Sequence, residues 1–261
     1  MHPVLFHIGP QAVRGYGVML MLGFLAGIWL SSRQASRLGL RSDLPIDLGV
    51  WVLVASIIMA RLTYAALNWS DYATRPVAVI RIWEEGGLSF HGGLLGGVLA
   101  VAFYAWRARL SFWRLADMLA PGLALGYGIA RFGCLLNGCC YGRPTSLPWG
   151  IVFPGITTEP SHPTQIYAAV GSFALCAVLL RIQTRLRVQG QLFLLYLMLY
   201  AVLRAIVEVF RRGISARELC CGFTQAQVAS LAIFAAAALA FLWRARRGFH
   251  RGPAPGERGA V

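Results

Sequence analysis

The 261-residue sequence contains no lysine, and aspartate and glutamate together number only 10. Charged residues make up 13% of the chain, about half the share of an average soluble domain. The basic residues, all of them arginine, number 24, and most lie in short gaps between apolar runs. A nucleic-acid-binding protein would gather them on one face instead. The composition therefore excludes an ordinary soluble domain and argues against nucleic acid as a partner.

Hydrophobic residues make up 57% of the chain. They fall in blocks of roughly 17–25 residues, the length that crosses a hydrocarbon core of about 30 Å. We therefore expect an all-α, polytopic integral membrane protein, with one transmembrane domain over residues 1–247 and a disordered cytoplasmic tail over residues 248–261. About seven transmembrane helices are expected, at residues 16–32, 46–68, 88–106, 115–136, 163–181, 190–210 and 224–243.

The arginines alternate from gap to gap, and this alternation predicts the topology. They follow the first, third, fifth and last expected spans, which by the positive-inside rule places the N-terminus outside and the C-terminus in the cytoplasm. The opposite gaps, 69–87 and 137–162, are rich in aromatic residues or in Gly and Pro. We expect them to form short arms and a head at the outer surface. Three outer arginines are exceptions to the rule: Arg211, Arg212 and Arg217.

The sixth expected span carries an ionisable stripe, Tyr200-x3-Arg204-x3-Glu208. A spacing of four places all three residues on one face of a helix. Ionisable residues inside a membrane are costly and usually face the protein interior. One alternative is an Arg204–Glu208 ion pair that only neutralises itself.

Arg131 lies near the outer end of the fourth expected span, and the predicted topology places Arg204 near the outer end of its own span. Guanidinium groups offer planar, bidentate donors that suit phosphate. Two of them at headgroup depth indicate a phospholipid phosphate or another anion. The alternative for Arg131 alone is a side chain that extends to the interface.

Two histidines lie at the outer ends of expected spans. His91 is the histidine that falls inside a span, and an unperturbed pKa near 6.5 suits proton transfer at neutral pH. A satisfied hydrogen-bonding role is equally compatible with it. The pairs Gly92/Gly96 and Gly93/Gly97 that follow predict close helix packing. At the other site, Thr164 or His162 is expected to cap the fifth span, with Pro163 in its first turn.

The spacing of the six cysteines matches no C-x-x-C zinc pattern, so the sequence gives little support for a metal site. A disulfide from the 134–140 segment to Cys220 or Cys221 is conceivable on an oxidising side of the membrane.

Five separated motifs run along the chain: Tyr16-Gly17, His91-Gly92-Gly93, Ala130-Arg131-Phe132-Gly133-x3-Asn137-Gly138, His162-Pro163-Thr164-Gln165-x-Tyr167 and Tyr200-x3-Arg204-x3-Glu208. Their residues and order resemble the bacterial prolipoprotein diacylglyceryl transferase family. The sequence departs from the family at two positions, because many members carry Asn where this chain has Cys134 and Glu where it has Cys139. No role of those two family side chains can be transferred here.

The resemblance implies transfer of the diacylglyceryl group from phosphatidylglycerol to the lipobox cysteine of a prolipoprotein signal peptide. A thioether forms and glycerol phosphate is released, in the bacterial inner membrane, with the N-terminus periplasmic. His91 is then the expected base, with Tyr200 as the alternative, and Arg131 and Arg204 stabilise the phosphate. No metal or soluble cofactor is demanded. The other residues expected to bind substrate are Tyr16, Asn137, Gly138, His162, Gln165 and Glu208.

Two other classes of function remain open. An anion transporter or channel would use the arginine pair as a selectivity site, and it would need polar residues continuing to the cytoplasm. Apart from Arg61 and Asp117, we expect none in the cytoplasmic halves of the spans. A non-catalytic lipid-binding scaffold is the third possibility.

Overall fold

A computed structural model describes residues 4–9, 11–73, 75–81, 86–211, 218–220 and 222–250. Long helices occupy all seven expected places, with ends within a few residues of the prediction except where α1 and α9 run on. Helix α9 continues to residue 250, and the rest of the expected tail lies outside the described residues. The helices are α1 (Gly15–Arg37), α2 (Leu44–Leu67), α5 (Phe90–Arg107), α6 (Phe112–Leu136), α7 (Thr164–Ile182), α8 (Gln191–Val209) and α9 (Gln225–His250).

Six of these helices are long and apolar enough to cross a membrane, which confirms the all-α membrane fold. The exception is α5, which has 18 residues and begins with His91 and several glycines. Seven spans therefore remain a prediction.

The connections contain short elements that were not predicted. The described residues include two antiparallel strand pairs, one of them before α1, where Val4 pairs with Arg14 and Gly9 lies between the strands with a φ of +60°. The expected outer arm holds short helical turns. These elements are β1 (Val4–Ile8), β2 (Gln11–Arg14), α3 (Trp69–Tyr72), η1 (Pro76–Val79), η2 (Gln183–Arg185), β3 (Glu218–Cys220) and β4 (Phe223–Thr224).

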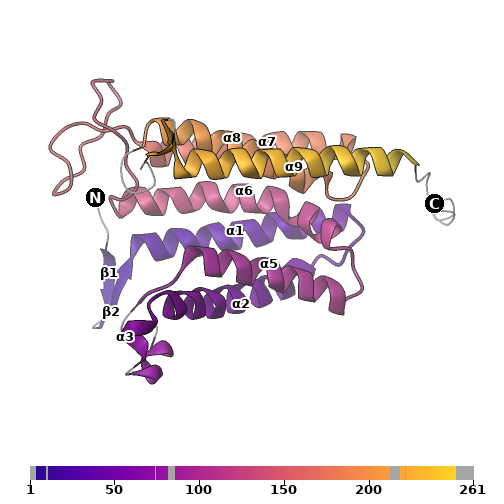
Figure 1. Ribbon diagram of the computed structural model, residues 1–261, viewed down its shortest axis with the longest axis horizontal. Coiled ribbons are helices and arrows are strands. Elements are labelled where there is room, and N and C mark those ends of the chain that lie inside the picture. The colour runs from indigo at the N-terminus through magenta and orange to yellow at the C-terminus, as the bar shows by residue number, and fades with distance from the viewer. Residues whose placement is uncertain are drawn as a thin grey trace. The chain divides into compact units, whose positions relative to one another are not determined.

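The chain forms two compact units, one made of residues 1–31 and 117–261 and the other of residues 32–116. In the first unit, α8 and α9 run side by side (Figure 1). Helices α1 and α6 touch through glycines: a Cβ added at Gly126 would lie 2.7 Å from the Gly23 carbonyl oxygen, and one added at Gly122 would lie 2.5 Å from that of Gly27. This small-residue contact brings the two backbones together.

Asp117 of α6 fixes the start of α8. Its Oδ1 accepts a hydrogen bond from the Phe193 amide at 2.9 Å, and its Oδ2 accepts one from the Gly190 amide. The first amides of a helix have no partners within the helix, and a carboxylate also suits the positive end of the helix dipole. Asp117 is therefore a structural cap rather than a step on an ion path.

The second unit is built on the contact between α2 and α5. A Cβ added at Gly92 would lie 2.5 Å from the Met59 carbonyl oxygen, and one at Gly96 would lie 2.4 Å from that of Ala55. The predicted small-residue packing of this pair is confirmed.

Arg61, which is buried in α2, binds the connection that leads to α5. Its guanidinium donates to the carbonyls of Ala78 at 2.6 Å, Val79 at 2.8 Å and Gly87 at 3.1 Å. By the topology predicted above, that connection lies at the outer end of α2. The predicted topology and the expectation that Arg61 belongs to the cytoplasmic half of its span are therefore incompatible, and both stay predictions.

Candidate active site

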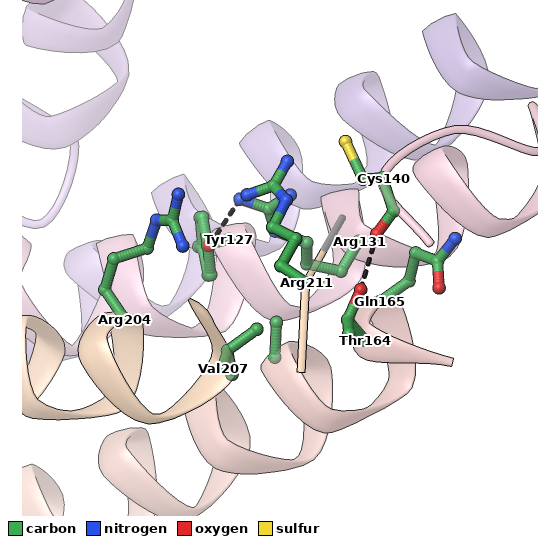
Figure 2. A pocket seen from close by; sticks show the side chains of 9 residues that line it. Tyr127, Arg131, Cys140, Thr164, Gln165, Arg204, Val207 and Arg211 are labelled. Atoms are coloured by element: carbon green, nitrogen blue, oxygen red, sulfur yellow. Dashed lines mark hydrogen bonds between the residues drawn. The ribbon is translucent and has the colours of Figure 1, made fainter. Parts of the chain in front are cut away.

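One pocket of the first unit contains three arginines. Helix α6 contributes to it with the loop that follows, as do the start of α7 and the end of α8. Figure 2 shows the side chains of Arg131, Arg204 and Arg211 reaching toward the same space. The lining residues are Tyr127, Arg131, Cys140, Thr164, Gln165, Ala168, Arg204, Val207 and Arg211.

Arg131 is held by a tyrosine one helical turn earlier. Its guanidinium donates to the hydroxyl oxygen of Tyr127, and its Cζ lies 4.3 Å from the centre of the Tyr127 ring. A second nitrogen of the same group lies 3.9 Å from the Cys134 sulfur. Sequence reasoning missed Tyr127, although its spacing of four from Arg131 repeats that of Tyr200 from Arg204.

Arg204 forms the expected ion pair with Glu208 on α8. The Glu208 side chain is fully buried, and its Oε1 has no hydrogen-bond partner within the described part of the chain. The pair thus holds Arg204 in place and offsets the cost of burying its charge. Tyr200 completes the stripe, with its ring edge-on to Tyr127 at 5.4 Å and stacked on Tyr196 at 6.0 Å.

The loop after α6 is tied to the start of α7 by two buried side chains. Gln165 Nε2 donates to the Cys139 carbonyl at 2.6 Å, and Thr164 Oγ1 donates to that of Cys140. The prediction that Thr164 or His162 caps α7 was wrong, because Pro163 occupies the cap position and no side-chain cap bond forms. Thr164 serves the pocket instead.

Arg211 enters the pocket through the backbone around it. It pairs with Gly142 in an isolated antiparallel bridge, and the Arg143 amide donates to the Phe210 carbonyl at 2.8 Å. The end of α8 is thereby joined to the loop between α6 and α7, residues 137–163, which we call the head loop. The sequence marked Arg211 only as an exception to the positive-inside rule, and its place in the pocket gives that exception a reason.

The remaining expected residues of this unit lie near the pocket without lining it. Gly138 has a φ of +67° and ends α6, with Asn137 exposed before it. The Tyr16 backbone packs against Gly133, because a Cβ added at Gly133 would lie 3.2 Å from the Cα and the carbonyl oxygen of Tyr16. His162 Nδ1 lies 3.1 Å from the Tyr167 hydroxyl, and its ring packs on Phe210.

His91 belongs to the second unit, at the start of α5. It follows Ser89, whose hydroxyl caps α5 by accepting from the Gly92 amide at 3.4 Å. The His91 side chain is exposed, and its ring meets that of Phe90 edge-on at 5.8 Å.

The pocket has an excess of positive charge. Glu208 pairs with Arg204, and among the described residues neither Arg131 nor Arg211 has a carboxylate partner. Partly buried guanidinium groups without counter-ions form a site for an anion, and their planar forks suit phosphate oxygens.

Three cysteine thiols lie beside the same pocket, and the structure leaves Cys134, Cys139 and Cys140 free. The disulfide considered from the sequence involves Cys221 and the Cys220 side chain, which lie outside the described residues. Hydrogen bonds from the thiols of Cys134 and Cys139 lower the pKa of Cys140, and the charges of Arg211 and Arg131 lower it further.

The sequence model of the family described as prolipoprotein diacylglyceryl transferase matches residues 3–243. The chain belongs to this family. Among curated relatives, a protein of Geobacter sulfurreducens is 38% identical over 237 residues, covering 89% of this chain and 91% of the relative. One from Synechococcus elongatus is 35% identical over 255 residues, covering 92% and 86%. A relative from Nostoc sp. is 37% identical over 223 residues, covering 80% and 78%.

All three relatives carry the name phosphatidylglycerol–prolipoprotein diacylglyceryl transferase. The family resemblance drawn from the five motifs is confirmed, and a phosphate-bearing lipid fits the excess of guanidinium groups in the pocket.

Proposed function

We propose that the arginine pocket carries out the transfer of a diacylglyceryl group from phosphatidylglycerol to a prolipoprotein. The observation that carries this proposal is the presence of Arg131, Arg204 and Arg211 around one pocket, where the described carboxylate Glu208 pairs with Arg204 alone. The departing group is a phosphate whose negative charge grows as its bond to the diacylglyceryl carbon breaks. Fixed donors in a site that excludes water stabilise such charge more strongly than water does.

In this reaction the thiolate sulfur of the lipobox cysteine attacks the glycerol carbon that carries the phosphate. The new C–S bond forms as the C–O bond breaks, and glycerol phosphate leaves with the electron pair. The thiol, with an ordinary pKa near 8.5, must first lose its proton. His91 is our candidate base and Tyr200 is the alternative.

Gln165 supports recognition of the glycerol headgroup. Its Nε2 is engaged by the Cys139 carbonyl, whereas its buried Oε1 has no partner among the residues described. We assign this oxygen as an acceptor for a headgroup hydroxyl. Tyr16, Asn137, Gly138 and His162 are assigned to the surrounding substrate site on the family motifs alone.

We place the protein in the bacterial inner membrane, with the pocket toward the periplasm, the N-terminus outside and the C-terminus in the cytoplasm. The distribution of arginines between the gaps supports this orientation. The seven-span transmembrane domain over residues 1–247, the cytoplasmic tail and the absence of nucleic acid as a partner belong to the same proposal. The acyl chains need no polar recognition and remain in the bilayer.

The test uses purified protein in phosphatidylglycerol vesicles with a synthetic lipobox peptide. Mass spectrometry should find the peptide heavier by one diacylglyceryl group, and a peptide with serine for the cysteine should stay unmodified. Phosphatidylethanolamine vesicles serve as the lipid control.

Arg131→Ala and Arg204→Ala should each abolish the product while the variants still insert. An unmodified cysteine peptide with the wild-type protein would overturn the activity and leave a lipid-binding scaffold. Full activity in both variants would overturn the role of the arginines.

A further inference from the structure

The end of helix α6 brings three cysteine sulfurs together. The sulfur atoms of Cys134, Cys139 and Cys140 all lie within 4.8 Å of one another. Three thiolates bound to one Zn²⁺ at about 2.3 Å stand roughly 4 Å apart, so this spacing needs little adjustment to hold the ion.

The backbone explains why residues so spaced in the sequence converge. Gly138 adopts a φ of +67°, the Gly138 amide donates to the Leu135 carbonyl at 3.1 Å, and the Cys139 amide donates to the Cys134 carbonyl at 3.1 Å. These are the two bonds of a Schellman motif, which places the side chain of the residue after the glycine against the last turn of the helix. The motif thus sets Cys139 on Cys134.

The third sulfur is placed by an unusual backbone at Cys140. Its φ is +64°, a region that residues with a side chain seldom adopt, and such conformations persist where surrounding contacts hold them. The holding contacts are the hydrogen bonds from Thr164 and Gln165 to the carbonyls of Cys140 and Cys139. The three thiols, each buried or half-buried, are therefore held both by the turn at the end of α6 and by the hydrogen bonds from the start of α7.

The surroundings fit a negatively charged metal–thiolate group. A guanidinium nitrogen of Arg131 lies 3.9 Å from the Cys134 sulfur, and Cys140 lines the pocket together with Arg131 and Arg211. Binding of Zn²⁺ by three thiols releases three protons and leaves a group of charge −1, which these guanidinium groups offset. Hard cations such as Mg²⁺ prefer oxygen ligands and do not suit three sulfurs.

We propose that Cys134, Cys139 and Cys140 form a binding site for Zn²⁺ with an open fourth position. Three protein ligands and one exchangeable position distinguish reactive zinc sites from closed structural ones. Because Cys140 lines the arginine pocket, the fourth ligand comes from that pocket. If the proposed function holds, this ligand is the sulfur of the incoming lipobox cysteine, which the ion keeps as the thiolate that attacks the lipid.

Metal content gives the first test, and it requires no turnover. The full-length protein is purified in detergent under reducing conditions, equilibrated with Zn²⁺, freed of excess ion and analysed by mass spectrometry for metal. We expect about one zinc ion per chain, and an affinity lower by roughly 100-fold or more for Cys139→Ser or Cys134→Ser. Cys176→Ser is the matched control, because Cys176 lies within α7 and donates to the Pro121 carbonyl at 3.4 Å.

Zinc retained at the same level by wild-type protein and by a variant with all three cysteines changed to serine would overturn the site. A disulfide between two of the three that persists in reductant would also overturn it. Transferase activity in a zinc-free protein would remove the ion from the reaction while leaving the proposed function intact.

Co²⁺ in place of Zn²⁺ tests the fourth ligand. The near-ultraviolet thiolate-to-cobalt band should strengthen when the cysteine lipobox peptide is added and stay unchanged with the serine peptide. An identical spectrum with both peptides would overturn the role of the substrate sulfur.

Discussion

The Arg131 guanidinium donates a hydrogen bond to the Tyr127 hydroxyl, one turn earlier on α6, and lies over the ring of the same residue. Tyr127 in turn meets Tyr200 of α8 edge-on at 5.4 Å. An arginine of one helix is thereby positioned against the ionisable stripe of another through a side chain that carries no charge.

Tyr127→Phe separates the two contributions of this residue, because it keeps the ring and removes the hydroxyl. A hydrogen bond to a charged group contributes about 1.5–3 kcal/mol, so kcat/KM for the lipid should fall about tenfold to hundredfold. Initial rates of peptide lipidation measure this change. Tyr104→Phe on α5 is the matched control, and equal rates for the two variants would contradict the positioning role.

Arg211→Ala should weaken lipid binding. The backbone bridge of Arg211 to Gly142 survives the change, so the pocket keeps its shape while one guanidinium is lost. Removal of one donor to a charged transition state costs roughly 10²–10³-fold in rate. The rate of Arg211→Lys should lie between those of the wild-type protein and Arg211→Ala, since lysine keeps the charge but not the planar guanidinium. Lipidation kinetics across phosphatidylglycerol concentrations check both, with Arg185→Ala as control, and an unchanged KM and kcat would refute the assignment.

Glu208→Ala should lower both the stability of the fold and the lipidation rate, because it leaves the Arg204 charge without its partner. Breaking a buried pair from one side costs about 3–5 kcal/mol, whereas replacing both partners by apolar residues is often neutral. The double variant Arg204→Leu, Glu208→Leu should therefore recover thermal stability in detergent but stay inactive. An active double variant would mean that the pair is structural only.

The base is decided by comparing His91→Gln with Tyr200→Phe across pH 6–9. If His91 takes the proton, His91→Gln should lower the rate and remove the fall in rate on the acid side of the profile, while Tyr200→Phe should keep that fall. Wild-type rates for His91→Gln over the whole range would exclude His91 as the base.

Gly126→Ala tests the contact between α1 and α6. The added Cβ would lie 2.7 Å from the Gly23 carbonyl oxygen, so the helices must separate. Forced overpacking costs about 1–3 kcal/mol, and the melting temperature in detergent should drop by several degrees. Gly17→Ala is the matched control, since a Cβ there has open space within 4 Å. Equal melting temperatures would show that the backbones adjust without cost.

Local spacing predicted much of the first unit. The length of the apolar blocks located all seven long helices, and the spacing of four grouped Tyr200, Arg204 and Glu208. The same rule applied to α6 would have found Tyr127. Arg211 and Thr164 could not be assigned in this way, because they reach the pocket only through the hydrogen bonds that fold the head loop back onto α7 and α8.

The cysteine cluster escaped the sequence for a related reason. The spacing of Cys134, Cys139 and Cys140 resembles no metal motif, and their sulfurs converge through the left-handed backbone at Gly138 and at Cys140. The glycine after Asn137 was a visible sign of the first turn. The residue type gave no sign of the positive φ at Cys140, since cysteine seldom adopts this conformation.

The pocket is assembled from segments that leave the ribosome at different times. Arg204 follows Arg131 by 73 positions, and the segment that carries Arg204 and Arg211, from α8 to just beyond its end, is synthesised after α6 and α7. Ribosomes synthesise a chain from its N-terminus at roughly 5–20 residues per second, so Arg204 is added several seconds after Arg131. Tyr127 is synthesised four residues before Arg131, so its hydroxyl is present as a hydrogen-bond acceptor during that interval. Newly synthesised α6 therefore carries within itself a hydrogen-bond acceptor for the buried charge of Arg131, which lowers the cost of placing that charge in the bilayer.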